Sequence, residues 1–158
     1  MSHSNEALNL SETPGHEHLE SNERVVPLPI ISKEAEKELY SMAYSFYNNG
    51  KFEEALDCFL YLVRANTETV RYWSGLAAAH QRLKNYLEAI GAYAVAALLD
   101  AKDPQIHMHA ADCFFAINEG AQALDALKTA EKLATGQEKY HQLLSRIAIL
   151  RTAWKELN

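Results

Sequence analysis

The sequence has few cysteines and no long apolar run, and each shortage excludes a class of protein. Its two cysteines, Cys58 and Cys113, lie in apolar helical patterns without the spacing of a metal site or a disulfide framework. We therefore expect two buried, reduced thiols. No apolar run approaches the roughly 20 residues that a membrane-spanning helix needs. No basic start followed by an apolar stretch marks a secretory signal. A cytoplasmic protein without membrane insertion is expected.

Patterns that indicate catalysis, metal binding or nucleic-acid binding are also missing. The net charge is −6, residues 1–35 hold six acids against two bases, and no basic stripe is interleaved with aromatics, so we expect no nucleic-acid partner. No glycine-rich phosphate loop or partnered nucleophile is visible. His107 and His109 are two residues apart on a predicted helix and face different directions, unlike a metal-binding pair. We expect no enzyme, no cofactor and no metal.

What the sequence does contain is an internal repeat of 34 residues. Two columns of alanine and one of bulky residues follow this step: Ala43, Ala77 and Ala111; Ala55, Ala89 and Ala123; Phe59, Tyr93 and Leu127. A period of 34 with small residues twelve apart is typical of tetratricopeptide repeats, in which two antiparallel helices approach closely where alanine replaces bulk. Gly50 is expected to end a helix in the left-handed conformation. Gly120 stands where the pattern has a bulky residue and predicts looser packing in the third repeat.

The predicted fold is all-α: a right-handed superhelical solenoid of three tetratricopeptide repeats with a C-terminal capping helix. Residues 1–31 are expected to form a flexible acidic arm, because Pro27 and Pro29 would interrupt a helix there. The predicted repeats span residues 32–67, 68–101 and 102–135. After Gly136, residues 136–158 carry an apolar stripe at helical spacing, which predicts a helix that covers the apolar edge of the last repeat.

The first helix of each repeat is expected to line the concave side of the solenoid, and the helical period selects the side chains that point into it. The candidate peptide-binding residues are Tyr40, Tyr44, Tyr47 and Asn48 in the first repeat, Ser74, Ala78 and Gln81 in the second, and Met108, Asp112 and Phe115 in the third. This surface suits an extended peptide whose apolar side chains enter pockets between tyrosines while phenol and amide groups bond its backbone. The alternative is that some tyrosines pack within the domain itself.

Two segments, Leu39–Val63 and Tyr72–Leu99, resemble the LcrH/SycD family of class II type III secretion chaperones beyond the generic repeat. The shared features are Ala43-Tyr44, Phe46-Tyr47-Asn48 before Gly50, Gly75-Leu76-Ala77-Ala78 and Tyr93-Ala94-Val95-Ala96. The resemblance implies a cytosolic chaperone that holds a hydrophobic translocator, or another secreted effector protein, by an extended segment. It also implies that a homodimer is one possible oligomeric state of the chain.

Two other functions stay open, a general tetratricopeptide-repeat adaptor and a scaffold within a secretion or assembly machine. An adaptor that clamps an acidic carboxyl terminus needs lysine, asparagine and arginine at defined groove positions. This chain has Tyr40, Tyr44, Gly75, Gln105 and His109 there. A scaffold would use the same groove for a permanent partner. The chain's own apolar, proline-rich stretch Val26–Ile31 is a further candidate occupant of the groove.

Overall fold

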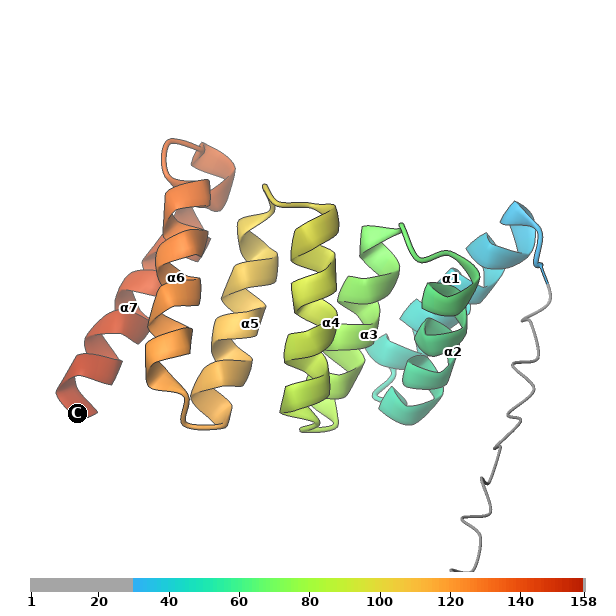
Figure 1. Ribbon diagram of the computed structural model, residues 1–158, viewed down its shortest axis with the longest axis horizontal. Helices are drawn as coiled ribbons and strands as arrows, with labels where there is room; N and C mark the ends of the chain where they lie inside the picture. Colours follow the sequence, from blue (N-terminus) through green and yellow to red (C-terminus); the bar gives the residue numbers. More distant parts are fainter. Residues whose placement is uncertain (1–29, 158) are drawn as a thin grey trace, which may run out of the picture.

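The computed structural model describes residues 30–157, and these residues are helical with short connecting turns (Figure 1). The helices are α1 (Lys33–Asn48), α2 (Phe52–Ala65), α3 (Val70–Arg82), α4 (Tyr86–Leu99), α5 (Pro104–Ala116), α6 (Gly120–Ala134) and α7 (His141–Leu157), with a 3₁₀ turn, η1 (Glu138–Tyr140), before α7. The predicted all-α class is confirmed. Of the predicted arm and its apolar stretch, only Ile30 and Ile31 lie within the described residues.

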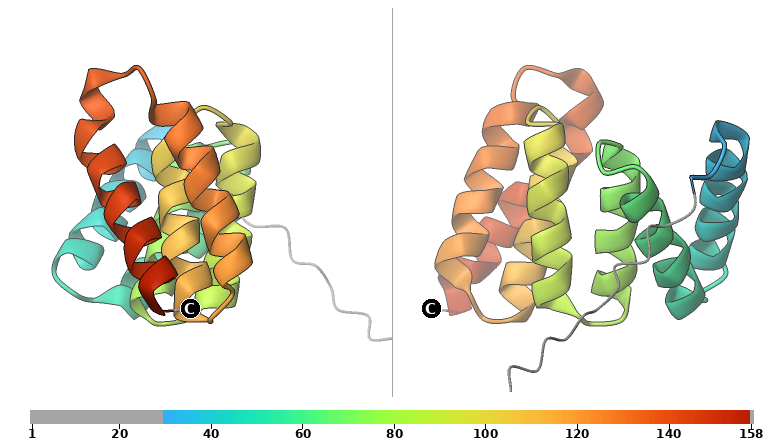
Figure 2. Two further views of the ribbon diagram at one scale, coloured as in Figure 1. Left: turned by 90° about the vertical axis from the view of Figure 1, so that its left-hand side faces the viewer. Right: turned by 45° about the vertical axis from the view of Figure 1, so that its right-hand side comes forward.

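The helices follow one another in a row, with α1 at one end and α7 at the other (Figure 1). The most extensive packing lies within the pairs α1–α2, α3–α4 and α5–α6, and each pair also packs on the next. Figure 2 shows α7 alongside α6 at the end of the row. Each helix therefore buries its apolar side mainly against its immediate neighbours, as a stacked repeat requires.

The turns that join the two helices of each pair share one backbone conformation. The residues with positive φ in these turns are spaced 34 residues apart. Gly50, Lys84 and Asn118 all have positive φ, at 76°, 63° and 63°. The residue after each turn donates its backbone N–H to a carbonyl in the last turn of the preceding helix, at 2.8–2.9 Å. Glycine adopts this left-handed conformation freely, whereas a lysine or asparagine there costs about 1 kcal/mol. The repeat thus keeps its turn even where the glycine is lost.

Side-chain caps set the start of two helices that carry the site described below. The Ser32 hydroxyl accepts a hydrogen bond from the backbone N–H of Ala35 at 3.1 Å at the start of α1. Asp103 accepts one from Gln105 at 2.9 Å, and Pro104 occupies the first position of α5. Both arrangements satisfy backbone donors that a helix start leaves unpaired.

The repeated alanines form the closest contacts of the core. All six have no exposed surface, and Phe59, Tyr93 and Leu127 of the bulky column are at most 2% exposed. One core cluster lies across the first two repeats and reaches Cys113, and a second lies where α5 and α6 meet α7 through the fully buried Ile147. The predicted spacing therefore corresponds to buried contacts, since only small side chains let two helices approach this closely.

Two expectations about single residues need correction. Gly120 does not loosen the third repeat, because a Cβ placed there would collide with the indole ring of Trp154. The glycine instead lets α7 pack tightly, and Trp154 also lies 5.0 Å from the ring centre of Phe115. Cys113 is buried as expected, and burial raises its pKa to about 12, but Cys58 is only half-buried.

Within residues 30–157, no helix combines the length and apolar character needed to cross a bilayer.

Candidate functional site

A cleft of about 320 Å³ opens where α1, α3 and α5 face one another, and we call it the tyrosine cleft. It is lined by Tyr40, Tyr44, Tyr47, Phe59, Arg71, Ser74, Gly75, Ala78, Gln81, Tyr93, Asp103, Gln105, Ile106 and His109. The walls come from the first helices of the three repeats. The floor comes from Phe59 of α2 and Tyr93 of α4, which reach between those helices.

The tyrosine cleft contains six of the ten candidate residues that the sequence suggested. These are Tyr40, Tyr44, Tyr47, Ser74, Ala78 and Gln81. Tyr44 is 56% exposed, whereas Tyr40 and Tyr47 are half-buried. The tyrosine rings are therefore not sealed inside the domain, and the ring of Tyr44 in particular is open to a ligand.

Tyr40 is the centre of an aromatic cluster at one wall of the cleft. Its ring centre lies 6.5 Å from that of Tyr44, 6.1 Å from that of Phe59 and 5.6 Å from that of Tyr72. Such contacts hold aromatic rings in fixed orientations with their edges or faces presented outward. The wall is thus a preformed apolar surface.

Gly75 allows Phe59 to reach the floor of the cleft. A Cβ at Gly75 would collide with the ring of Phe59, which is 2% exposed. Neither residue was among the ten candidate peptide-binding residues, although Gly75 stands at one of the groove positions that an adaptor clamp would use. The sequence showed Phe59 as a member of the bulky column. Its contact with Gly75 follows only from the packing of α2 against α3.

The floor also carries a buried hydrogen bond. The Tyr93 hydroxyl donates to the amide oxygen of Gln81 at 2.9 Å, and burial raises the pKa of Tyr93 well above its usual value. The amide nitrogen of Gln81 makes no hydrogen bond to another residue in the range 30–157. Gln81 is therefore fixed in orientation with two N–H donors left for a ligand.

His109 closes the cleft on the side of α5. Its ring lies parallel to that of Tyr93, with centres 5.8 Å apart and planes at 13°. Burial lowers the pKa of His109, and Arg146 adds to this effect while Asp112 opposes it. The imidazole is therefore neutral near pH 7 and acts as an aromatic surface with one polar edge.

The third-repeat candidates lie elsewhere, and this part of the prediction was wrong about their position. Met108 is 1% exposed in the core beside Ile147. Asp112 accepts a hydrogen bond from Arg146 at 2.7 Å, and Phe115 packs on Trp154. Helix α7 covers this face of α5, as the first helix of another repeat would.

Asn48 is also absent from the lining of the tyrosine cleft. It is the last residue of α1 and is exposed. The helical period placed it next to Tyr47, but at the end of α1 its direction leads away from the cleft. The cleft is lined instead by four residues outside the candidate set: Asp103, the N-cap of α5, and Gln105, Ile106 and His109 of α5.

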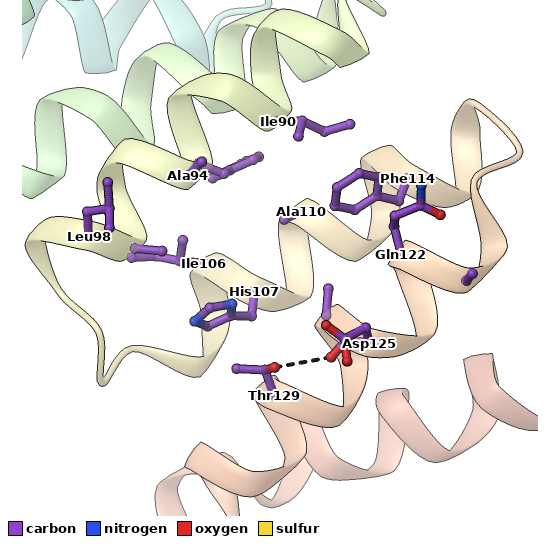
Figure 3. A pocket seen from close by; sticks show the side chains of 14 residues that line it. Ile90, Ala94, Leu98, Ile106, His107, Ala110, Phe114, Gln122, Asp125 and Thr129 are labelled. Atoms are coloured by element: carbon purple, nitrogen blue, oxygen red, sulfur yellow. Dashed lines mark hydrogen bonds between the residues drawn. The ribbon is translucent and has the colours of Figure 1, made fainter.

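A second cleft, of about 740 Å³, lies between α4, α5 and α6 (Figure 3). Only Tyr93 and Ile106 line both clefts. Its wall on α4 is apolar and includes Leu98, which is 85% exposed, whereas Asp125 and Thr129 of α6 lie on the other side. The sequence pattern did not predict this cleft.

We take the smaller tyrosine cleft as the candidate site. It combines exposed aromatic rings with oriented polar groups, which is the usual composition of a ligand site, whereas most of the residues that line the larger cleft are aliphatic. No cluster of three or more potential metal ligands occurs in the part of the chain that the structure describes. The rings, hydroxyls and amide that line the tyrosine cleft offer apolar contacts and hydrogen bonds to a ligand.

Known proteins share both this sequence and this arrangement of helices. The tetratricopeptide repeat family matches residues 40–105. Low calcium response locus protein H of Yersinia pestis is 32% identical over 125 residues, which cover 79% of this chain and 74% of that protein. The solved structures below extend the comparison to three dimensions.

Two solved structures are bound to peptides or regions of other proteins. SycD of Yersinia enterocolitica, a type III secretion chaperone in complex with a peptide of the translocator YopD, has a TM-score of 0.77 and 31% identity, over 80% of this chain and 97% of SycD. PcrH in complex with the chaperone binding region of PopD also has a TM-score of 0.77, with 28% identity over 83% of this chain and 99% of PcrH. SycD has further been solved as an alternative dimer.

Proposed function

This chain belongs to the LcrH/SycD family of tetratricopeptide-repeat chaperones of type III secretion, and on that premise we propose that it binds a hydrophobic translocator protein through the tyrosine cleft. The observation that carries the proposal is the open aromatic wall, in which Tyr44 is 56% exposed beside Tyr40 and Phe59. Peptide complexes of SycD and PcrH support the same kind of client.

The bound segment is a short extended peptide. A cleft of about 320 Å³ accommodates two or three side chains, and burying one leucine-sized side chain contributes roughly 1.5–3 kcal/mol. The free amide N–H groups of Gln81 face the cleft and bond a backbone carbonyl of the peptide. Apolar contacts thus supply most of the affinity, and the amide sets the position of the peptide backbone.

The protein works by mass action and not by catalysis. Binding covers apolar surface that would otherwise aggregate or insert into a membrane too early, and it stabilises whichever form of the client is bound. In this proposal the chaperone acts in the bacterial cytoplasm before secretion, without a cofactor. The proposed division of the chain is an arm (1–31), three repeats (32–67, 68–101 and 102–135) and a cap (136–158). A homodimer is one oligomeric state compatible with the proposal, and SycD has been solved as an alternative dimer.

The test is a pair of substitutions in the aromatic wall. Replacing Tyr40 and Tyr44 together with alanine removes the anchoring surface but leaves the buried alanine contacts intact. After co-expression in the native host, wild-type chaperone should recover a protein with long apolar segments, identified by mass spectrometry, and the double variant should not.

A matched control separates loss of the cleft from general damage. Leu98→Gln changes an 85% exposed residue of the second cleft and should leave client recovery unchanged. Far-UV circular dichroism should show equal helical content in all three proteins. Recovery of the client by a folded Tyr40/Tyr44 double variant would contradict the assignment of the site.

A further inference from the structure

Arg71 lies in the wall of the tyrosine cleft as a cation that the fold holds in place. It is the second residue of α3, is exposed, and lines the cleft next to Ser74. Its guanidinium lies 4.7 Å from the ring centre of Tyr40 and 5.3 Å from that of Tyr72. Two aromatic faces therefore restrict a side chain that would otherwise sample many rotamers.

No acid of the described residues neutralises this cation. The ion pairs within residues 30–157 join Asp112 to Arg146 and Glu131 to Arg151, and the neutral imidazole of His109 lies 4.0 Å from Asp112. Glu36, the acid beside Tyr72, accepts hydrogen bonds from the Tyr72 hydroxyl at 3.2 Å and from the Asn66 amide at 3.5 Å instead. The guanidinium of Arg71 thus keeps its N–H donors for a ligand or for water.

A peptide in the cleft would change the surroundings of Arg71. A segment that covers Tyr40 also displaces water from the guanidinium stacked on that ring, and removing water from a charge is unfavourable unless a partner replaces it. A planar guanidinium matches a carboxylate with two parallel hydrogen bonds, and pairs of this kind are stronger than neutral hydrogen bonds. A peptide with a suitably placed acid is therefore favoured over one without it.

A negative charge at the start of α5 gives this preference a direction. Asp103, the cap of α5, lines the same cleft and makes no ion pair with the residues from 30 to 157. An acidic peptide side chain is attracted towards Arg71 on α3 and repelled from Asp103 on α5. The two charges together distinguish the two ways in which an extended peptide can run through the cleft.

We propose that the segment bound in the tyrosine cleft carries an acidic side chain at a fixed spacing from its apolar anchor, and that Arg71 pairs with that carboxylate. This inference rests on the proposed function and adds a specificity-determining residue to it. The apolar anchor supplies affinity, and the acid selects the register and direction of the client segment.

The experiment uses a display library of random 12-residue peptides whose carboxyl termini are joined to the carrier protein, so that no free terminal carboxylate competes. The full chain is the bait, as wild type, Arg71→Gln, Arg82→Gln and the Tyr40/Tyr44 double alanine variant. Arg82 is the matched control, because it also lies on α3 and stacks on an aromatic ring, 4.4 Å from the centre of Phe52, but does not line the cleft.

Wild type and Arg82→Gln should enrich peptides with apolar anchors and an Asp or Glu at a constant distance from them. Arg71→Gln should keep the apolar anchors and lose the acidic preference. For one selected peptide, replacing its acid by the matching amide should weaken binding to wild type about tenfold, measured by fluorescence anisotropy, and should change binding to Arg71→Gln less than twofold.

Each failure has a separate meaning. Apolar peptides without an acidic preference, or an acidic preference that persists in Arg71→Gln, would overturn the role of Arg71 while leaving the proposed function intact. The proposed function and the inference fail together in two cases. In the first, wild type enriches no peptides. In the second, every peptide that wild type enriches also binds the Tyr40/Tyr44 variant. Circular dichroism of each variant confirms that the bait is folded.

Discussion

Replacing Gly75 with alanine tests the packing that forms the floor of the tyrosine cleft. Alanine in a helix interior is about 1 kcal/mol more favourable than glycine. At Gly75, however, the new methyl group would collide with the ring of Phe59, which is almost fully buried. Overpacking of this kind costs about 1–3 kcal/mol. The expected net effect is therefore a loss of stability of up to about 2 kcal/mol.

Gly91 provides the matched substitution. It lies inside α4, is exposed, and a Cβ there meets no atom within 4 Å. Gly91→Ala should therefore stabilise the fold by about 0.5–1 kcal/mol through helix propensity alone. The difference between the two variants isolates the cost of displacing Phe59, which should be about 1–3 kcal/mol.

Urea denaturation followed by far-UV circular dichroism measures both free energies of unfolding. The same samples can be tested for client binding, because Phe59 lines the cleft. Gly75→Ala should weaken binding, and Gly91→Ala should leave it unchanged. Equal stability of the two variants would refute the close contact between Gly75 and Phe59, and with it the described floor of the site.

Two further predictions concern pH and the cap. Burial lowers the pKa values of His80, His107 and His109 in the folded state below the ordinary 6.5, so protonation favours the unfolded chain. Their contribution to stability is complete above pH 6.5 and is lost as the pH falls, and thermal melts should show a lower Tm at pH 5.5 than at 7.5. Replacing the three histidines with glutamine should flatten this dependence, and an unchanged slope would contradict it. Trp154→Ala should reduce the free energy of unfolding by about 2–4 kcal/mol, because it empties the contact with Gly120 and Phe115. A Tm equal to that of wild type would exclude a stabilising role for the cap.

The parts of the fold that depend on local spacing were predictable. The 34-residue columns indicated which alanines are buried, and Gly50 indicated where the first turn lies. The family resemblance, which rested on residues of the first two repeats, is confirmed by relatives of about 30% identity over most of the chain. These signals repeat along the sequence, so each is reinforced by its copies.

The candidate site was predictable only in the repeats that are followed by another tetratricopeptide repeat. Tyr40, Tyr44 and Ser74 line the cleft because α1 and α3 are each followed by a further repeat. Met108 and Phe115 occupy matching positions in α5, but α7 packs on them and they belong to the core. A helical period gives the direction of a side chain relative to its own helix, and it contains no information about which element covers that direction.

The sequence alone therefore determined the class of fold, the repeat and the aromatic character of the cleft, because each follows from the order of residues along a helix. Tertiary structure decided where the cleft ends, that Phe59 and Tyr93 form its floor, and that α4 has a second apolar face. It also placed Arg71 in the cleft wall without an ion pair to any residue from 30 to 157. These features depend on contacts between residues far apart in the chain. The packing of whole helices brings such residues together, and no local pattern records it.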